Sequence, residues 1–333
     1  MPHFQVDSSI DFARAISIIC IVGLCHLFNY TNLLDLDWFN PVIHFMLGFF
    51  MFISGFLLGN KYRIRTKMDI VSFYKKRVVR IYPLFFISLV LMYITEQLHP
   101  WANPYFDFQH LLVSVLGLGV FQYPMTLTLW FVEIMLFYYM IFPALQSSSF
   151  IKSALSFSIV CLTFLVIHLF LFPIDISVVL FLPCFYAGVI VGKSKFSGRW
   201  KLHFLFDGKL LPLSLPLALG AYYLPSMVSV NIVVELFLTT FSRIVGGLAI
   251  IQVSTVLADK LPVSLNKIVN VISYSSMAIY MFHRPFWNLL NVRAWSDGVV
   301  KILFLFLSVP VIFYLSYHIQ YLYDMIVKRY ITK

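Results

Sequence analysis

Several ionisable residues of this 333-residue chain lie inside long apolar stretches, where a charge is costly. Arg14 and His26 fall in the first stretch, Glu133 in a middle one, and His283 and Arg284 in a late one. Histidine takes protons from hydroxyl groups near neutral pH, and arginine holds anions or polarises carbonyl groups. These residues are therefore candidates either for group-transfer chemistry or for the path of a transported molecule.

Each of these residues also has a simpler explanation. Arg14 can extend to lipid headgroups, and His26 can be a hydrogen-bonded core histidine. Glu133 lies one turn into its stretch and can reach water. His283 and Arg284 are adjacent, and adjacent helix positions point about 100° apart, so at most one of them faces the interior squarely. Taken together, the residues predict a polar route between the two faces of a helical bundle.

A basic cluster precedes the third apolar stretch. The segment SFYKKRVVRIYPLFF, residues 72–86, contains Lys75, Lys76, Arg77 and Arg80. The two arginines are three positions apart and share a helix face. Arginine forks match phosphate oxygens, which membrane anchoring does not require. The cluster either orients the chain at a membrane surface or also binds a phosphate-bearing molecule.

The elements that position these residues are predicted to be transmembrane helices. The chain is 61% hydrophobic and 11% charged, and apolar runs long enough for a bilayer recur along it. The runs are continuous rather than alternating, which excludes a transmembrane β-barrel. We therefore predict an all-α, polytopic transmembrane helical bundle that forms one membrane domain over residues 1–333. The apolar stretches fall at 10–30, 41–59, 81–98, 110–123, 127–145, 153–172, 176–192, 210–230, 233–257, 268–290 and 299–327.

The distribution of basic residues predicts the topology. Segment 61–80 carries eight Lys and Arg residues and segment 193–209 carries five, so both are expected on the cytoplasmic side. Five apolar stretches separate them, so one stretch is not a full crossing. We assign this to 110–123, which is short and contains two glycines, as a re-entrant or interfacial piece on the outer side. About ten crossings remain, with both termini in the cytoplasm.

Other features of the sequence predict packing rather than chemistry. Gly55 and Gly59 have the spacing of close helix contacts. The four cysteines lie in apolar runs without metal spacing, so we expect buried thiols and no metal site. The aromatic loop at 96–109 suits a membrane interface or an acceptor entrance. The start of the chain lacks the features of a cleavable signal peptide, so the first helix is expected to be retained. The net charge of +10 is attributed to membrane lipid rather than to nucleic acid.

Five separated motifs occur along the chain: FARAISIICIVGLCHLF with Arg14 and His26, FMFISGFLL with Ser54, FYKKRVVRIYPLFF with Arg77, Arg80 and Pro83, LWFVEIMLFYYMIFP with Trp130, Tyr139 and Pro143, and YSSMAIYMFHRPF with Ser276, Tyr280, His283 and Pro285. In this order they resemble the motifs of the acyltransferase-3 family. Members of that family are multi-pass membrane enzymes that O-acylate sugars of bacterial surface glycans.

The chain departs from the family pattern at two places. The family usually has ten residues between the Arg and His of its first helix, whereas eleven separate Arg14 from His26. Twelve positions along an α-helix end about 120° from the starting face. Either a π-bulge within 15–25 restores the alignment, or the two side chains face different neighbours. Glu133 lies three residues after Trp130, where many members have their acidic residue five after.

The resemblance implies an O-acetyltransferase that takes acetyl-CoA, a co-substrate, from the cytoplasm. The acceptor would be a hydroxyl of a surface polysaccharide, such as O-antigen or exopolysaccharide, or of its undecaprenyl-linked precursor. The implied location is the bacterial inner membrane, in contact with membrane lipid and with possible partners in glycan assembly. A transporter or flippase for a lipid-linked sugar is the alternative, and a structural subunit of a glycan-synthesis complex is a third interpretation.

The resemblance also suggests roles for individual residues. His26 is the expected general base or transient acyl carrier. The other residues are assigned as follows: Arg14 orients the donor or polarises its thioester, Arg77 and Arg80 bind the donor phosphates, Ser54 and Tyr139 donate hydrogen bonds to the acyl group, His283 positions the acceptor, and Glu133 is a further catalytic candidate.

Overall fold

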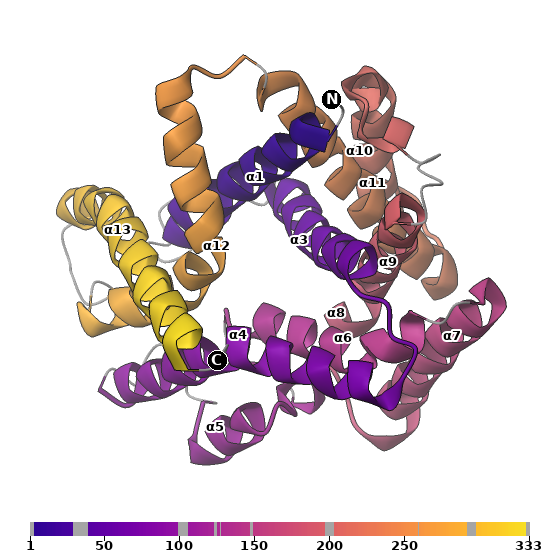
Figure 1. The fold of residues 1–333 in the computed structure, drawn as a ribbon, viewed down its shortest axis with the longest axis horizontal. Helices are drawn as coiled ribbons and strands as arrows, with labels where there is room; N and C mark the ends of the chain where they lie inside the picture. The colour runs from indigo at the N-terminus through magenta and orange to yellow at the C-terminus, as the bar shows by residue number, and fades with distance from the viewer. Residues whose placement is uncertain are drawn as a thin grey trace. The chain divides into compact units, whose positions relative to one another are not determined.

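The computed structural model describes residues 3–28, 39–98, 106–122, 125–126, 128–146, 149–196, 203–258, 260–291 and 298–330. All regular elements in these ranges are helical, which confirms the predicted all-α class (Figure 1). Half of the predicted interfacial loop at 96–109, residues 99–105, lies outside the described residues. The elements are α1 (His3–Cys20), η1 (Ile21–His26), α3 (Asn40–Lys61), α4 (Lys67–Leu98), α5 (Phe108–Val115), η3 (Gly119–Phe121), α6 (Trp130–Leu145), α7 (Phe150–Val166), η4 (Ile167–Leu171), α8 (Ser177–Leu180), α9 (Leu182–Phe196), η5 (His203–Phe206), η6 (Gly208–Leu210), α10 (Leu211–Met227), α11 (Ile232–Ala258), α12 (Val263–Leu289) and α13 (Gly298–Tyr330).

The helices are those of a multi-pass membrane protein. Within the described ranges, eight helices are long and apolar enough to cross a bilayer. The 16-residue α6 and the more polar, 27-residue α12 occupy the positions of two further predicted crossings. In contrast, the stretch at 110–123 contains only the eight-residue α5 and the short turn η3. This stretch is too short to span a bilayer, as predicted, and the number and direction of the crossings stay predictions.

The chain forms two compact units, which are described separately. Unit 1 comprises residues 1–13, 38–73 and 137–261, and unit 2 comprises residues 14–37, 74–136 and 262–333. Each unit therefore combines segments that are distant in the sequence. The expectation of a single membrane domain stays a prediction.

Unit 1 is built on close contacts between glycine-containing helices. A Cβ at Gly55 or Gly59 of α3 would collide with the backbone of α9 at Phe185 or Val189. The reciprocal glycines of α9, at 188 and 192, lie against the α3 backbone in the same way. The predicted packing role of the Gly55 and Gly59 spacing is confirmed, because the missing side chains let the two backbones touch.

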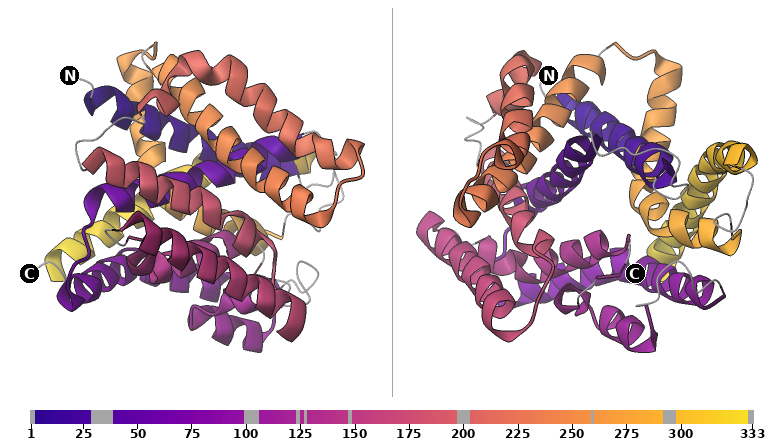
Figure 2. Two further views of the ribbon diagram at one scale, coloured as in Figure 1. Left: turned by 90° about the vertical axis from the view of Figure 1, so that its right-hand side faces the viewer. Right: turned by 180° about the vertical axis from the view of Figure 1, so that it is seen from behind.

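Unit 2 centres on the pair α12 and α13, which lie side by side (Figures 1 and 2). Trp287 Nε1 of α12 donates to Ser308 Oγ of α13 at 2.8 Å, and Asn288 Nδ2 donates to Glu96 Oε1 of α4 at 2.8 Å. These buried bonds fix the C-terminal half of α12 against both neighbours. The bonds therefore hold in place the helix that carries His283.

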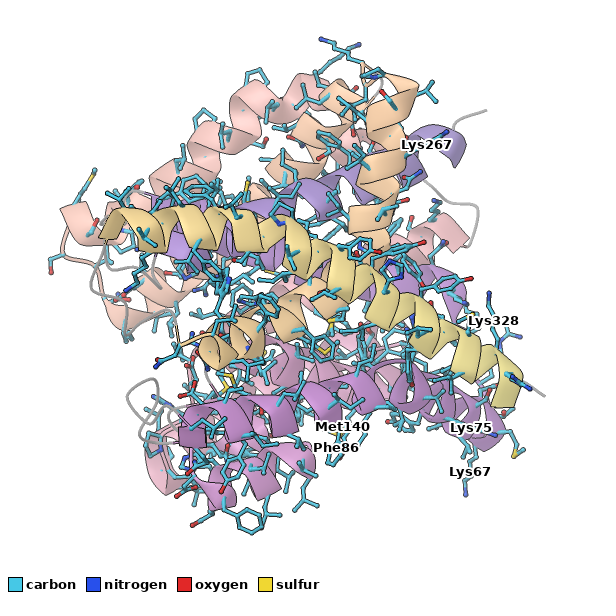
Figure 3. The ribbon with its side chains drawn as sticks, turned by 90° about the vertical axis from the view of Figure 1, so that its left-hand side faces the viewer. Lys67, Lys75, Phe86, Met140, Lys267 and Lys328 are labelled. Carbon is cyan, nitrogen blue, oxygen red and sulfur yellow. The ribbon has the colours of Figure 1, made fainter. Side chains whose placement is uncertain are left out.

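Basic side chains gather at one end of unit 2. Lys75 of α4, Lys267 of α12 and Lys328 of α13 all lie toward the end of the unit that faces right in Figure 3. Tyr323 near the end of α13 donates to the backbone oxygen of Val79 on α4, which ties these helix ends together. The cations thus form a polarised face, as the positive-inside pattern predicts.

Candidate active site

The first helix changes its hydrogen-bonding pattern just before His26. Residues Ile21–His26 form a π-helix, whose wider turn accommodates one extra residue. Arg14 Nη2 donates to Ser276 Oγ at 3.1 Å, and His26 Nδ1 lies 2.9 Å from His283 Nε2. Both side chains thus face α12. Of the two predicted alternatives, the π-bulge is the correct one, at 21–26 and therefore slightly later than the predicted 15–25.

The two contacts with α12 lie on one face of that helix. Ser276 and His283 are seven residues, or two turns, apart, which corresponds to about 10 Å of axial rise. The Cα positions of Arg14 and His26 are expected about 18 Å apart on a straight α-helix. The side chains therefore engage α12 at points closer together than the backbone spacing suggests.

The hydrogen bonds of His283 fix the tautomers of both histidines. His283 Nδ1 lies 2.8 Å from the Tyr280 carbonyl oxygen and 3.2 Å from that of Ile279. Carbonyl oxygens only accept, so Nδ1 of His283 carries the proton and Nε2 is an acceptor. His26 then donates from Nδ1 to His283. This leaves Nε2 of His26 with its lone pair and, among the described residues, without a hydrogen bond.

Aromatic rings surround the histidine pair. The rings of His26 and His283 stack with centroids 4.9 Å apart, and Trp287 meets His283 edge-on at 5.2 Å. Tyr280 lies 6.1 Å from His26 and 5.7 Å from Phe131. His283 is fully buried, whereas His26 is partly exposed, so His26 is the more accessible member of the pair. Both ring nitrogens of His283 are engaged in these contacts, and its role in positioning the acceptor stays a prediction.

Arg284 points to a different neighbour from His283. Its Nη1 donates to Thr128 Oγ1 at 3.2 Å. Thr128 has a φ of 70°, a left-handed conformation that is strained for a β-branched residue. The bond from Arg284 is one contact that holds this strained residue in the segment before α6. No sequence pattern indicates Thr128, because only its backbone geometry distinguishes it.

Glu133 is buried beneath the short segment of α5 and η3. Its side chain is 2% exposed, so the simple explanation that it reaches water is wrong. The hydroxyls of Ser114 and Thr126, 3.0 Å apart, lie beside its carboxylate. A Cβ on Gly119 would collide with the carboxyl group, so glycine is required for this cover. The structure therefore assigns Glu133 to a closed polar cluster.

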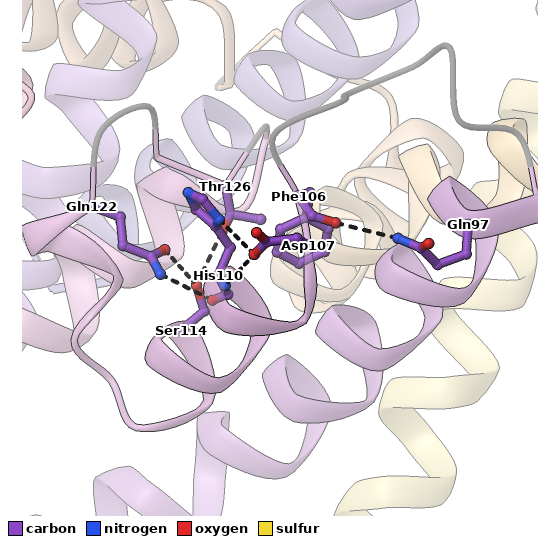
Figure 4. A network of polar contacts seen from close by, with 7 residues as sticks. All are labelled: Gln97, Phe106, Asp107, His110, Ser114, Gln122 and Thr126. Atoms are coloured by element: carbon purple, nitrogen blue, oxygen red, sulfur yellow. Dashed lines mark hydrogen bonds and ion pairs between the residues drawn. The ribbon is translucent and has the colours of Figure 1, made fainter.

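A chain of hydrogen bonds links this cluster to the exposed surface (Figure 4). Ser114 Oγ donates to Gln122 Oε1 at 3.4 Å, and Gln122 Nε2 donates to the His110 carbonyl at 3.1 Å. His110 in turn contacts Asp107 at 2.8 Å through both its backbone amide and its ring. These two bonds hold the pKa of the exposed Asp107 carboxyl below its usual value. The network orders the segment that covers Glu133.

The two arginines of the basic cluster differ in their surroundings. Arg77 is half-buried, whereas Arg80 is exposed, as are Lys75 and Lys76. Pro83 does not end the helix, because the 32-residue α4 runs through it from Lys67 to Leu98. Neighbouring groups can satisfy the backbone that a proline frees within a membrane helix. The arginines and the histidine pair both belong to unit 2.

The remaining predicted residues lie in unit 1. Ser54 is partly buried on α3, next to a glycine that contacts α9. Tyr139 is buried on α6, and its ring lies 6.2 Å from that of Phe185. Within unit 2, the side chains of Arg14 and His26 therefore both contact α12, the helix that carries His283. Ser54 and Tyr139 are placed in the other unit.

The sequence interpretation did not single out Arg243 of α11. This arginine is 6% exposed, and its Cζ lies 4.6 Å from the centroid of the Phe181 ring. Its position inside the apolar stretch 233–257 was a usable signal, because buried cations in membrane helices are rarely incidental. It belongs to unit 1, apart from the histidine pair.

Comparison with known proteins identifies the chain at the level of its family. A family model described as an acyltransferase domain matches residues 7–321, which is nearly the whole chain. No curated protein and no solved structure gave a match.

Proposed function

Because the chain belongs to the acyltransferase-3 family and is a multi-pass membrane acyltransferase, we propose that it O-acetylates a sugar hydroxyl with acetyl-CoA as donor. The acceptor is a surface polysaccharide or its lipid-linked precursor. The observation that carries the proposal is the His26–His283 pair, since it presents an imidazole nitrogen that has no hydrogen bond among the described residues, on a partly exposed side chain. The family assignment does not favour the alternative of a sugar flippase.

In the proposed reaction, His26 Nε2 is the general base. It takes the proton from the acceptor hydroxyl as the oxygen attacks the thioester carbonyl. The resulting imidazolium keeps its Nδ1–H bond to neutral His283, which orients the ring and stabilises the charge. Collapse of the tetrahedral intermediate breaks the carbon–sulfur bond. The proton on Nε2 then passes to the thiolate, so that the products are the acetyl ester and free coenzyme A.

Arg14 is proposed to act on the donor. Its guanidinium bonds to Ser276, two turns of α12 from His283, which fixes it along the same face as the base. From there it can donate to the thioester carbonyl and stabilise the developing oxyanion. Arg77 and Arg80 are proposed to bind the phosphates of coenzyme A, because guanidinium groups pair with phosphate oxygens in a forked geometry.

The charged face of unit 2 supports a proposal for the side of the membrane from which each reactant enters. The end that carries Lys75, Lys267 and Lys328 is proposed to be cytoplasmic, together with both termini. Coenzyme A then enters from that side, and the acceptor from the opposite side of a bacterial inner membrane. Glu133 lies in the first turn of α6, beneath the cover formed by α5 and η3, and this part of unit 2 is proposed to be the outer end of the path.

The proposal is tested with purified protein and acetyl-CoA labelled in the acetyl group. Release or transfer of the label supports acyl transfer, and protein that neither hydrolyses nor transfers it contradicts the proposal. Mass spectrometry of surface glycans with and without the gene identifies the acceptor. Loss of acetyl groups on deletion supports the assigned substrate class, whereas unchanged glycans contradict it.

A further inference from the structure

A second buried arginine lies near the middle of α11, in unit 1. Arg243 is 6% exposed, and its Nε and Nη1 atoms are buried without a hydrogen-bond partner. Burying a guanidinium without partners for its donors is strongly unfavourable, so such groups normally meet an anion. The Phe181 ring, whose centroid lies 4.6 Å from Cζ, stabilises the positive charge only in part through a cation–π contact.

Among the described residues, the surroundings of Arg243 include polar side chains but no carboxylate in an ion pair with it. Asp175 interacts with Arg243 only at longer range, and its Oδ1 accepts from the Ser177 amide at 2.8 Å. Tyr138 donates to the Val178 carbonyl at 2.6 Å, which directs its hydroxyl to the backbone. Among the described residues, the positive charge therefore has no ion-pair partner.

Packing holds the arginine in place from two sides. Its backbone carbonyl lies directly against Gly48 of α3, where a Cβ would collide with it. One turn earlier on α3, His44 bonds through Nδ1 to the Asn40 carbonyl at 2.8 Å and lies 5.7 Å from the Tyr222 ring. Because that carbonyl only accepts, His44 presents Nε2 as its remaining polar atom. The arginine is thus fixed among aromatic side chains, with donors left unused.

We propose that Arg243 forms an oxyanion-binding site within unit 1 that takes the phosphate or carboxylate of a ligand. A planar guanidinium with unused donors matches oxygens of this class, and the aromatic surroundings suit a ligand with an apolar body. The same oxyanion chemistry can come from an amphiphile in the membrane or from a free ion. This site is independent of the proposed acyl transfer at His26.

The test is thermal unfolding of the purified full-length protein in a neutral detergent. Dodecyl phosphate, inorganic phosphate and dodecanol are added separately to the wild type, Arg243→Met and Arg65→Met. Arg65 is exposed and in the same unit, so its variant is a control for the loss of one charge. A bound ligand stabilises the folded state by mass action, so we expect the apparent Tm to rise by about 3 °C with dodecyl phosphate.

The rise is expected in the wild type and in Arg65→Met, but not in Arg243→Met. A response to inorganic phosphate as well identifies the source as a free ion, and a response to dodecyl phosphate alone identifies an amphiphile. No phosphate-dependent rise in the wild type, or an equal rise in Arg243→Met, overturns the proposal. If Arg243→Met does not fold, Arg243→Lys replaces it, with a reduced rise expected because the fork is lost, and an undiminished rise overturns the proposal.

Discussion

Nδ1 of His26 lies 2.9 Å from Nε2 of His283, whose own Nδ1 is bonded to the backbone of its helix. The pair thus forms a directional relay in which a carbonyl group fixes His283 and His283 fixes His26. Nε2 of His26, a partly exposed residue, is the end of this relay.

Replacement of His26 by alanine is expected to abolish acyl transfer while membrane insertion is preserved. Removal of a general base lowers turnover by about 10²–10⁴-fold. Labelled acetyl transfer measures the activity, and a reporter fused at the C-terminus measures insertion. Retained activity in a correctly inserted variant would exclude His26 as the base.

His283 is expected to act through His26, so the chemistry of its replacement should matter. In His283→Gln the amide can still accept from His26 and donate to the Tyr280 carbonyl, whereas His283→Leu can do neither. We expect kcat to fall about tenfold in the glutamine variant and about 10²-fold in the leucine variant, with an unchanged KM for acetyl-CoA. Equal losses in the two variants would indicate that His283 only fills space.

The bond between Ser276 and Arg14 is expected to contribute to the orientation of the arginine. Ser276→Ala should lower kcat/KM by about tenfold, since one bond to a charged group is lost. Ser275→Ala is the matched control, because the neighbouring hydroxyl bonds to the Val271 carbonyl of its own helix. Steady-state kinetics of the two variants give the comparison. A similar loss in both would assign the effect to helix packing.

The π-helix is expected to absorb the extra residue of the first helix. Deletion of Leu24, a partly exposed residue within it, should convert Ile21–His26 to α-helix and keep both Arg14 and His26 facing α12. We expect activity within about threefold of the wild type, because eleven positions return to nearly the same face. Insertion of one alanine after Leu24 is the opposite test and should abolish activity. Loss of activity in the deletion variant with normal insertion would contradict this account.

The basic cluster is expected to bind the donor through its arginines. The double variant Arg77→Ala and Arg80→Ala should raise the KM for acetyl-CoA by about tenfold or more, because charge-assisted bonds to phosphate are lost. The double variant Lys75→Ala and Lys76→Ala removes the same charge and is the control. Insertion is checked with the C-terminal reporter, since these charges also set topology. Equal increases in KM would favour simple anchoring.

The class of the protein and the positions of its helices could be predicted from the sequence. Apolar runs of bilayer length, separated by basic segments, are sufficient for this, because lipid allows the backbone few other solutions. The short 110–123 stretch and the close packing at Gly55 and Gly59 were predictable because length and side-chain size act locally, whereas α9 as the packing partner was not. The spacing between Arg14 and His26 even indicated the π-bulge.

The partners of the polar residues were decided only by the tertiary structure. Hydrogen bonds between residues more than 250 positions apart, such as His26 with His283, depend on how the helices pack. Burial of Glu133 comes from the cover of α5 and η3, and Arg243 forms no ion pair with a carboxylate among the described residues. Sequence periodicity gives the face of a helix on which a side chain lies. Sequence periodicity does not give the neighbouring helix against which this face packs. For His26 that neighbour is α12, and the hydrogen bond to His283 on α12 determines which ring nitrogen of His26 carries the proton.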